Sequence, residues 1–218
     1  MIKCCIFDLD GTLLDTIGTI TYYVNETLKG FDFPPISVDE CKRFVGNGPK
    51  DLIKRVMNSK NYEDESGIAE ILSAYKEKYA IDPYYLTAPY DGITEMLDAL
   101  FDKGILLAVI SNKQNEAVVP CVKHFFGERF ALSRGSMPDV PLKPAPDAVY
   151  KIMDELGVRP DEVVYVGDSE VDMQTGKAFC AAKTVGVAWG FRDADVLWAN
   201  GADRVILTAE ELCSEVLA

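Results

Sequence analysis

Hydrophobic positions in the second part of the chain alternate between helical and strand spacing. Ile93, Met96, Leu97 and Leu100 recur at i, i+3, i+4 and i+7, which predicts a helix that stops at Gly104. Residues 105–110 are continuously apolar, as expected of a strand covered on both faces. The same alternation predicts helices over residues 115–124, 145–156 and 170–179, strands over residues 163–166, 183–187 and 205–207, and a last helix opened by a capping box from Thr208 to Glu211.

The first residues of the chain form another apolar run, from Ile2 to Phe7, which only Lys3 interrupts. A strand here, together with the alternation that begins at residue 91, implies an α/β fold. The expected core is a Rossmann-like parallel sheet whose strands are joined by right-handed crossovers. We expect this core to consist of residues 1–14 and 84–218.

Residues 15–83 differ from the rest, because they show helical spacing and no convincing strand. A helical block between the first and second strands of a parallel sheet predicts an inserted small helical cap subdomain. The two crossings, residues 12–16 and 83–89, predict a hinge. The helical patterns cover residues 17–28, residues 37–57 with a break near residues 46–49, and residues 68–79.

The composition is that of an ordinary globular protein, with 48% hydrophobic and 26% charged residues in a chain of 218. Its apolar runs are too short to span a bilayer, and its first residues show no signal-peptide pattern, so we expect a cytoplasmic protein. The six cysteines include no Cys-x-x-Cys pair and are interpreted as reduced, buried thiols. His124 is the sole histidine, so a triad built on histidine is not expected.

The net charge of −13 argues against nucleic acid and anionic membrane as partners, because the sequence has no basic run. No obligate protein partner is predicted either. The acidity also bears on the chemistry of any site. If the substrate is an anion, a local group must attract it against the field of the whole chain.

Polar side chains follow the predicted strands at the points where those strands end. Asp8 and Asp10 close the first strand, and Ser111 and Asn112 follow the strand that ends at residue 110. Ligands of an open parallel sheet bind at the carboxyl ends of its strands. Further polar residues come from the loop at residues 143–144 and from residues 167–172, which follow the strand at 163–166.

Taken one at a time, these residues are ordinary turns and helix caps, but together they indicate a phosphate and Mg²⁺ site. Two carboxylates crowded at one strand end repel each other unless a cation lies between them or one holds a proton. Carboxylate oxygens are ligands that Mg²⁺ prefers. A hydroxyl, backbone N–H groups and a lysine bind phosphate oxygens. The metal would also offset the acidic charge.

In this order, the four segments resemble the motifs of the haloacid dehalogenase (HAD) superfamily, in its branch with a small helical cap after the first strand. The motifs are Asp8-Leu9-Asp10-Gly11-Thr12, Ser111-Asn112, Lys143-Pro144 and Gly167-Asp168-Ser169-x-x-Asp172. Two further segments resemble phosphoglycolate phosphatases, namely Gly46-Asn47-Gly48 in the cap and Pro89-Tyr90-Asp91-Gly92 on the return to the core.

The resemblance implies a Mg²⁺-dependent phosphatase that hydrolyses a small phosphorylated metabolite through an aspartyl-phosphate. Asp8 is the implied nucleophile, and Asp10 is the implied general acid and then general base. The implied metal ligands are the Asp8 carboxylate, the Asp10 backbone carbonyl and Asp168. Asp172 is implied to position Lys143. The implied contacts to phosphate or substrate are Thr12, Ser111, Asn112 (through its backbone), Lys143 and the cap residues Gly46, Asn47 and Gly48.

Proteins with other functions share these motifs. A sugar phosphomutase and a pyrophosphatase of the same superfamily stay open, and a non-catalytic phosphate-binding or partner-binding protein is the alternative from another class. Lys50 lies where phosphonoacetaldehyde hydrolases of this superfamily use a cap lysine. Those enzymes lack an acid at the position of Asp10, so we expect Lys50 to be a solvated helix residue.

Overall fold

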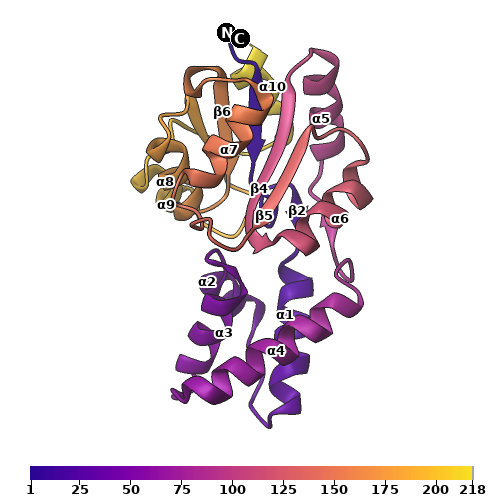
Figure 1. Cartoon of the computed structure of the whole chain (residues 1–218), viewed down its shortest axis with the longest axis vertical. Coiled ribbons are helices and arrows are strands. Elements are labelled where there is room, and N and C mark those ends of the chain that lie inside the picture. Colours follow the sequence, from indigo (N-terminus) through magenta and orange to yellow (C-terminus); the bar gives the residue numbers. More distant parts are fainter. Residues whose placement is uncertain (218) are drawn as a thin grey trace. The chain divides into compact units, whose positions relative to one another are not determined.

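The computed structural model describes residues 1–217 and contains a six-stranded parallel sheet (Figure 1). Its strands lie in the order β5-β4-β1-β6-β7-β8, so the first strand of the chain is central. This order confirms the predicted α/β fold with a parallel sheet. The strands are β1 (Cys4–Phe7), β4 (Leu106–Gln114), β5 (Leu132–Ser136), β6 (Val163–Gly167), β7 (Lys183–Val187) and β8 (Arg204–Ile206).

The register of the three central strands brings their carboxyl ends to one level. Phe7, the last residue of β1, pairs with Val109 of β4 on one side and with Val166 of β6 on the other. Residues that follow these positions in the three strands therefore emerge together at one edge of the sheet. This register brings Asp8 close to the segments that begin at Ser111 and at Asp168.

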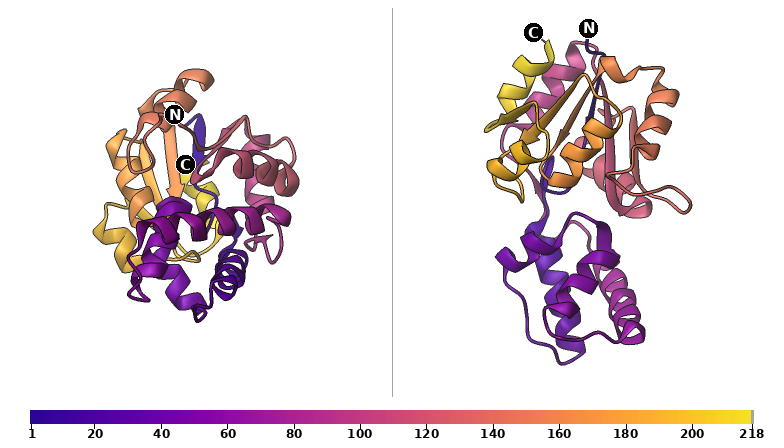
Figure 2. Two further views of the ribbon diagram at one scale, coloured as in Figure 1. Left: turned by 60° about the horizontal axis from the view of Figure 1, so that its bottom comes forward. Right: turned by 90° about the vertical axis from the view of Figure 1, so that its left-hand side faces the viewer.

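Helices cover both faces of the sheet, which explains why its central strands are apolar on both sides. Figure 2 shows the sheet between α7 and α10, and α10 packs beside α5. The face toward α7 buries Cys4, Ile6, Ala108 and Tyr165 against Ile152 and Met153 of that helix. The helices are α5 (Ile93–Asp102), α6 (Asn115–Phe126), α7 (Asp147–Leu156), α8 (Glu170–Ala178), α9 (Ala194–Ala199), α10 (Ala209–Leu217) and the 3₁₀ helix η1 (Pro160–Glu162).

The chain divides into two compact units, of which the sheet unit comprises Met1–Asp15 and the residues from Pro89 onward. The other unit, Thr16–Ala88, is helical. Ser37 caps its second helix in a reciprocal capping box with Glu40. Short strands β2 (Leu14–Asp15) and β3 (Ala88–Pro89) pair where the chain crosses between the units. The helices of this unit are α1 (Ile17–Gly30), α2 (Val38–Phe44), α3 (Gly48–Asn58) and α4 (Glu65–Ile81).

The elements of the sheet unit differ in part from those expected from the sequence. Strand β5 and helix α9 are additional elements, and β4 continues past Ile110 to Gln114 because it pairs with β5 across an irregularity in register. Ser111 and Asn112 therefore lie inside a strand.

All six cysteines are free thiols, and Cys4, Cys5, Cys41 and Cys121 are buried. The expectation of burial is wrong for Cys180, which is exposed in a turn after α8 with φ of 57°, and Cys213 is only partly buried.

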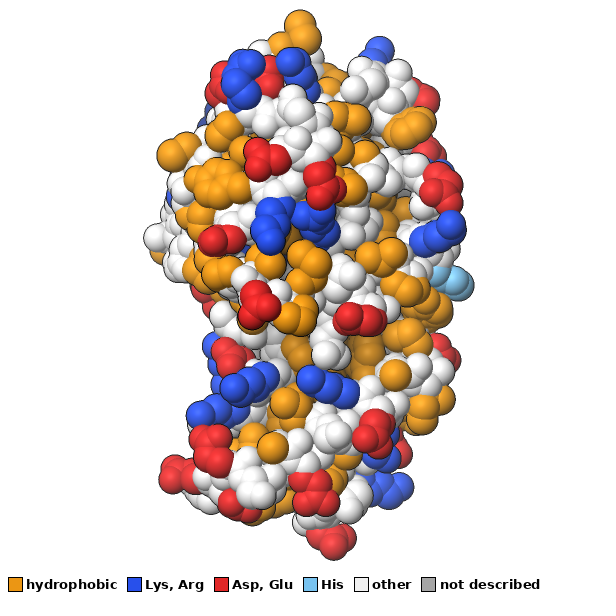
Figure 3. All heavy atoms as spheres, in the orientation of Figure 1, with side chains coloured by type: hydrophobic (Ala, Val, Ile, Leu, Met, Phe, Trp, Pro, Cys, Tyr) orange, Lys and Arg blue, Asp and Glu red, His pale blue; other side chains and the backbone are white. Residues whose placement is uncertain are grey.

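Among residues 1–217, every helix is too short or too polar to span a bilayer. On the face drawn in Figure 3, acidic and basic side chains are interspersed.

Candidate active site

Lys143 joins two carboxylates at the carboxyl end of the sheet. Its Nζ lies 2.6 Å from Oδ1 of Asp8, which directly follows β1, and 2.8 Å from Oδ1 of Asp172 in α8. The Lys143 side chain is only 4% exposed. Such burial is tolerated because the ammonium is paired on two sides by opposite charge.

The pKa values of this cluster are shifted by burial and by mutual charge. Burial raises the pKa of Asp8 to about 7, although the Lys143 ammonium pulls it down, and Asp172 and Asp10 raise it further. Burial alone would lower the pKa of Lys143, but Asp172 and Asp8 outweigh that effect and hold it well above its usual range. Lys143 therefore stays a cation, and Asp8 is a buried group whose charge depends on its surroundings.

Asp168, at the end of β6, is held at the centre of the site by groups from other segments. Its Oδ2 accepts a hydrogen bond of 2.7 Å from the backbone N–H of Phe191, and its Oδ1 accepts a long one of 3.4 Å from the Thr12 hydroxyl. Burial raises its pKa well above the usual range, and the nearby charges of Asp172 and Asp8 raise it further. A Cβ on Gly190 would overlap the Asp168 side chain, so glycine at that position leaves room for the carboxylate.

The carboxylates at this edge fit a divalent cation. One oxygen each from Asp8, Asp168 and Asp172 can be chosen so that all lie within 4.8 Å of one another, and all three residues are buried. Burial is the main cause of the raised pKa values of Asp8 and Asp168, and repulsion between the neighbouring carboxylates raises them further. Hard oxygen donors and unbalanced negative charge together suit an ion such as Mg²⁺.

The Asp10 carboxylate is engaged separately from this cluster. Its Oδ1 lies 2.9 Å from Nζ of Lys113, and the two side chains are 17% and 13% exposed. Asp10 was predicted to contribute its backbone carbonyl to the metal, so the ion pair leaves that prediction untouched. It does add Lys113, to which the sequence analysis gave no role.

Asn112 fixes the Lys143 loop through its side chain, and the backbone contribution that the resemblance implied stays a prediction. Its amide donates to the Lys143 carbonyl at 3.1 Å and accepts from the Lys143 N–H at 2.9 Å. The two bonds fix the loop that carries Lys143 against β4. Ser111 is 5% exposed, and its hydroxyl accepts from the backbone N–H of Lys113 at 3.2 Å.

Two further side chains belong to the site, and the sequence analysis gave neither a role there. The Tyr165 hydroxyl donates to Oδ1 of Asp172 at 3.2 Å from a fully buried position in β6. The Trp189 indole donates to the Thr12 carbonyl at 3.0 Å. Strand periodicity could have indicated Tyr165, because it lies two positions before Gly167 of the fourth motif and therefore on the same face of the strand. Trp189 follows the predicted strand at residues 183–187, at the same edge as the other motifs.

In the helical unit, the predicted cap residues Gly46 and Asn47 lie in the loop between α2 and α3, and Gly48 is the first residue of α3. Gly46 and Gly48 have φ of 119° and 82°, a backbone region that other residues rarely adopt. Arg55 of α3 donates to the Phe44 carbonyl at 2.9 Å and to the Asn47 side-chain oxygen at 2.7 Å. This arginine therefore fixes both ends of the loop.

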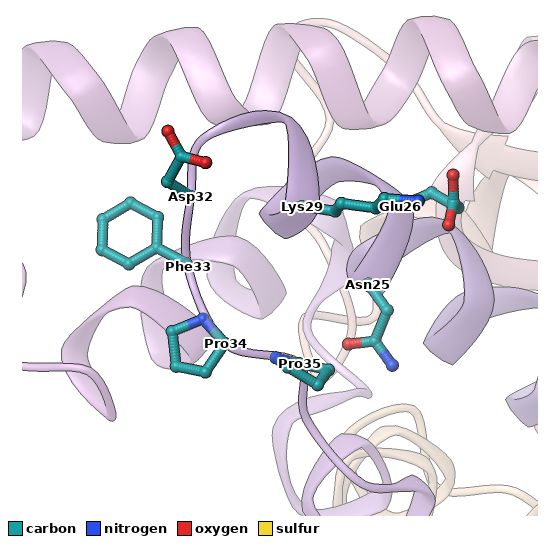
Figure 4. A pocket seen from close by; sticks show the side chains of 7 residues that line it. All are labelled: Asn25, Glu26, Lys29, Asp32, Phe33, Pro34 and Pro35. Atoms are coloured by element: carbon teal, nitrogen blue, oxygen red, sulfur yellow. The ribbon is translucent and has the colours of Figure 1, made fainter.

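The helical unit also has a hollow of about 590 Å³ beside the C-terminal part of α1 (Figure 4). Asn25 in its wall is itself bonded to the backbone of Ile36, as a donor at 3.0 Å and an acceptor at 2.8 Å. The hollow is separate from the predicted site residues, because it is lined by Asn25, Glu26, Lys29, Asp32, Phe33, Pro34 and Pro35.

A parallel sheet with buried aspartates and a lysine at the carboxyl ends of its strands defines the class of protein as a hydrolase of the HAD type. The family model for haloacid dehalogenase-like hydrolases matches residues 5–187, and the chain belongs to this family. The family resemblance seen in the sequence is thereby confirmed.

Relatives and solved structures agree with this family. The chain is 33% identical over 195 residues to phosphoglycolate phosphatase 1 of Pseudomonas aeruginosa, covering 86% of this chain and 71% of that protein. It is 31% identical over 190 residues to phosphoglycolate phosphatase of Aquifex aeolicus, covering 87% and 86%. A crystal structure from Lactobacillus delbrueckii subsp. bulgaricus, provisionally assigned as a phosphoglycolate phosphatase, superposes with a TM-score of 0.90 at 32% identity and 98% coverage of both chains.

These findings confirm the prediction of an enzyme, a HAD-type phosphatase. They also agree with a divalent metal at the acidic cluster, because phosphatases of this family generally use one.

Proposed function

We propose that this protein is a Mg²⁺-dependent phosphatase that hydrolyses 2-phosphoglycolate or a closely similar small phosphorylated metabolite. The observation that carries the proposal is the convergence of Asp8, Lys143, Asp168 and Asp172 at one edge of the sheet, within a chain about 30% identical to phosphoglycolate phosphatases. The substrate comes from the names of those relatives.

In this proposal Asp8 is the nucleophile. Its carboxylate attacks the phosphorus, and the bond from phosphorus to the ester oxygen breaks as an aspartyl-phosphate forms. Lys143 holds Asp8 in place through the contact of 2.6 Å and attracts the phosphoryl oxygens. Ser111 lies beside this position on β4 and supplies a hydroxyl to the same oxygens.

Asp10 is proposed to move the protons. As general acid it donates a proton to the ester oxygen of the leaving group, and as general base it then takes a proton from the water that attacks the aspartyl-phosphate. Inorganic phosphate leaves, and Asp8 and Asp10 return to their starting states. Two smaller barriers thus replace one large barrier.

Asp8, Asp168 and the Asp10 backbone carbonyl are proposed to hold Mg²⁺. When bound, the cation supplies positive charge that lets an anionic phosphate approach an anionic nucleophile. Asp172 takes a different part, because its carboxylate accepts bonds from Lys143, Tyr165 and Ser169. It is a positioning residue for Lys143.

The helical unit is proposed to act as the cap that selects the substrate. Gly46, Asn47 and Gly48 form its specificity loop, and Arg55 fixes the shape of that loop. Thr12 is proposed to support the site through its bond to Asp168.

Phosphate release from a panel of esters tests the proposal. The panel contains 2-phosphoglycolate, sugar phosphates, nucleotides and pyrophosphate, each measured with Mg²⁺, with chelator and with chelator followed by added Mg²⁺. We expect a clear preference for 2-phosphoglycolate that chelator abolishes and Mg²⁺ restores. Preference for pyrophosphate, or slow hydrolysis with rapid isomerisation of a sugar phosphate primed by a bisphosphate, would replace the proposed substrate.

A further inference from the structure

Lys113 is a cation at the catalytic edge that the mechanism above leaves without a task. It follows Ser111 and Asn112 in β4, and its Nζ lies 2.9 Å from Oδ1 of Asp10, 103 positions away in the sequence. The Lys113 side chain is 13% exposed, so it combines a largely buried stem with some access to solvent. A lysine stem is flexible, and its ammonium is a compact point charge.

In the proposed function, Lys143 lies on the phosphoryl side of the reacting bond and Lys113 on the side of the leaving group. Lys143 is enclosed between Asp8 and Asp172 and is 4% exposed, so it belongs to the phosphoryl end. Lys113 is paired with Asp10, which in the proposed function contacts the ester oxygen of the leaving group. One hydrogen bond joins the Lys113 ammonium to Asp10, and in the proposed function a second joins Asp10 to the ester oxygen. Two such lengths in succession place the ammonium within roughly 6 Å of that oxygen.

The negative charge around Asp10 gives this lysine an electrostatic task. The chain carries a net charge of −13, Asp8, Asp168 and Asp172 cluster at this edge of the sheet, and the charge of Asp10 acts on Asp8. An anionic leaving group next to these carboxylates would be repelled unless a cation faced it. The Lys113 ammonium beside Asp10 meets that need.

We propose that Lys113 binds a negatively charged group on the leaving group of the substrate, placed a few bonds from the ester oxygen. The substrate class is then a phosphomonoester of a small hydroxy acid, in which a carboxylate lies close to the phosphorylated hydroxyl. Lys113 exchanges part of its contact with Asp10 for this carboxylate when substrate binds. The inference rests on the proposed function, because it takes Asp10 as the group that meets the ester oxygen.

Two esters that differ only at the proposed contact test the inference. 2-Phosphoglycolate carries the carboxylate, and 2-hydroxyethyl phosphate replaces it by a neutral hydroxymethyl group. In Lys113→Gln we expect kcat/KM for 2-phosphoglycolate to fall by about 10- to 100-fold, mainly through KM, as for the loss of one charged hydrogen bond. The value for 2-hydroxyethyl phosphate should change far less, and Lys113→Arg should restore part of the loss.

Lys123→Gln is the matched control, because it makes the same change in net charge on the neighbouring helix α6 at a side chain that is 72% exposed. It should leave both esters unaffected, which separates a local contact from the field of the whole chain. Thermal unfolding of each variant shows whether the fold is retained.

The outcomes separate this inference from the proposed function. Equal losses on the two esters, or no loss on either, would overturn the role of Lys113 while leaving the phosphatase intact. A wild-type protein that prefers 2-hydroxyethyl phosphate to 2-phosphoglycolate would overturn it as well. If the wild-type protein releases phosphate from none of the esters, the proposed function itself fails and the inference fails with it.

Discussion

Lys143 and Asp8 are 135 positions apart in the sequence, yet Nζ of the lysine lies 2.6 Å from Oδ1 of the aspartate in the buried edge of the sheet. The same ammonium reaches Asp172 at 2.8 Å. Lys143 therefore bridges two carboxylates that would otherwise repel each other. It also fixes the direction of the Asp8 carboxylate, which the proposed mechanism requires of a nucleophile.

The first prediction concerns the proposed nucleophile. Asp8→Asn should lower phosphate release by about 10⁴-fold or more, because the amide cannot form an aspartyl-phosphate. The fold should be retained, since Lys143 keeps its partner Asp172. Phosphate release and the circular dichroism spectrum of the purified variant measure the two effects. Near-normal turnover would refute the assignment of Asp8.

The second prediction concerns the burial of Lys143. Lys143→Met leaves Asp8 and Asp172 buried without their shared cation, which should reduce the free energy of unfolding by about 3–5 kcal/mol. Lys177→Met is the matched control in the same unit, because Lys177 is 46% exposed and pairs with Asp203 at the surface. It should cost about 1 kcal/mol or less. Urea unfolding of both variants in chelator makes the comparison, and equal losses would contradict it.

The third prediction concerns pH and Asp8 in protein kept free of metal by chelator. Burial raises the pKa of Asp8 from an ordinary value of 3.8 to about 7. Between these values the folded state holds a proton that the unfolded state has lost, so this contribution to stability falls as pH rises. It is fully present below about pH 4 and gone above about pH 7.

Asp8→Asn isolates this contribution, because asparagine does not titrate. The free energy of unfolding of the wild type minus that of the variant should fall by at most about 1.4 kcal/mol per pH unit across the interval. Denaturant unfolding at several pH values measures the difference. A difference that is constant with pH, or that grows as pH rises, would show that Asp8 is ionised throughout.

The fourth prediction concerns Gly190, whose lack of a side chain leaves room for Asp168. Gly190→Ala would push a methyl group into that carboxylate and displace it, so metal affinity should drop by about 10- to 100-fold. Gly30→Ala is the control, because a Cβ there meets nothing within 4 Å. Activity titrated against Mg²⁺ measures the effect. Unchanged metal dependence in Gly190→Ala would argue against Asp168 as a ligand.

The fifth prediction concerns Arg55 and the loop that contains Asn47. Arg55→Met removes both hydrogen bonds to the loop, and KM for 2-phosphoglycolate should rise by about fivefold to tenfold, as for a bond worth about 1 kcal/mol. Lys54→Met is the control on the same helix, because Lys54 is 49% exposed and pairs with Glu65 at the surface. Steady-state kinetics of the two variants decide whether the loop contacts substrate: equal KM values would remove it from the site.

The sequence predicts the fold class and the motifs because both depend on local patterns. Apolar runs of strand length and helical spacing of apolar residues follow from burial and backbone geometry. Strand β5 escaped prediction because Leu132–Ser136 is mixed in polarity and is an edge strand that forms by pairing with β4. The extension of β4 to Gln114 has the same origin, since the partner strand and not the local sequence sets its end.

The candidate site was also predictable only in part: its residue types were, and the contacts between them were not. The residue types at the strand ends were enough to predict acids, a hydroxyl and a lysine for phosphate and metal chemistry, together with the family. Which pairs actually meet was decided by the tertiary structure. The register of β1 beside β4 brings Lys113 toward Asp10, and the loops before α7 and after β7 bring Lys143 to Asp8 and the Phe191 N–H to Asp168 across long sequence separations. Local sequence determines which chemistry is available, whereas these charge pairs form only after the sheet has folded.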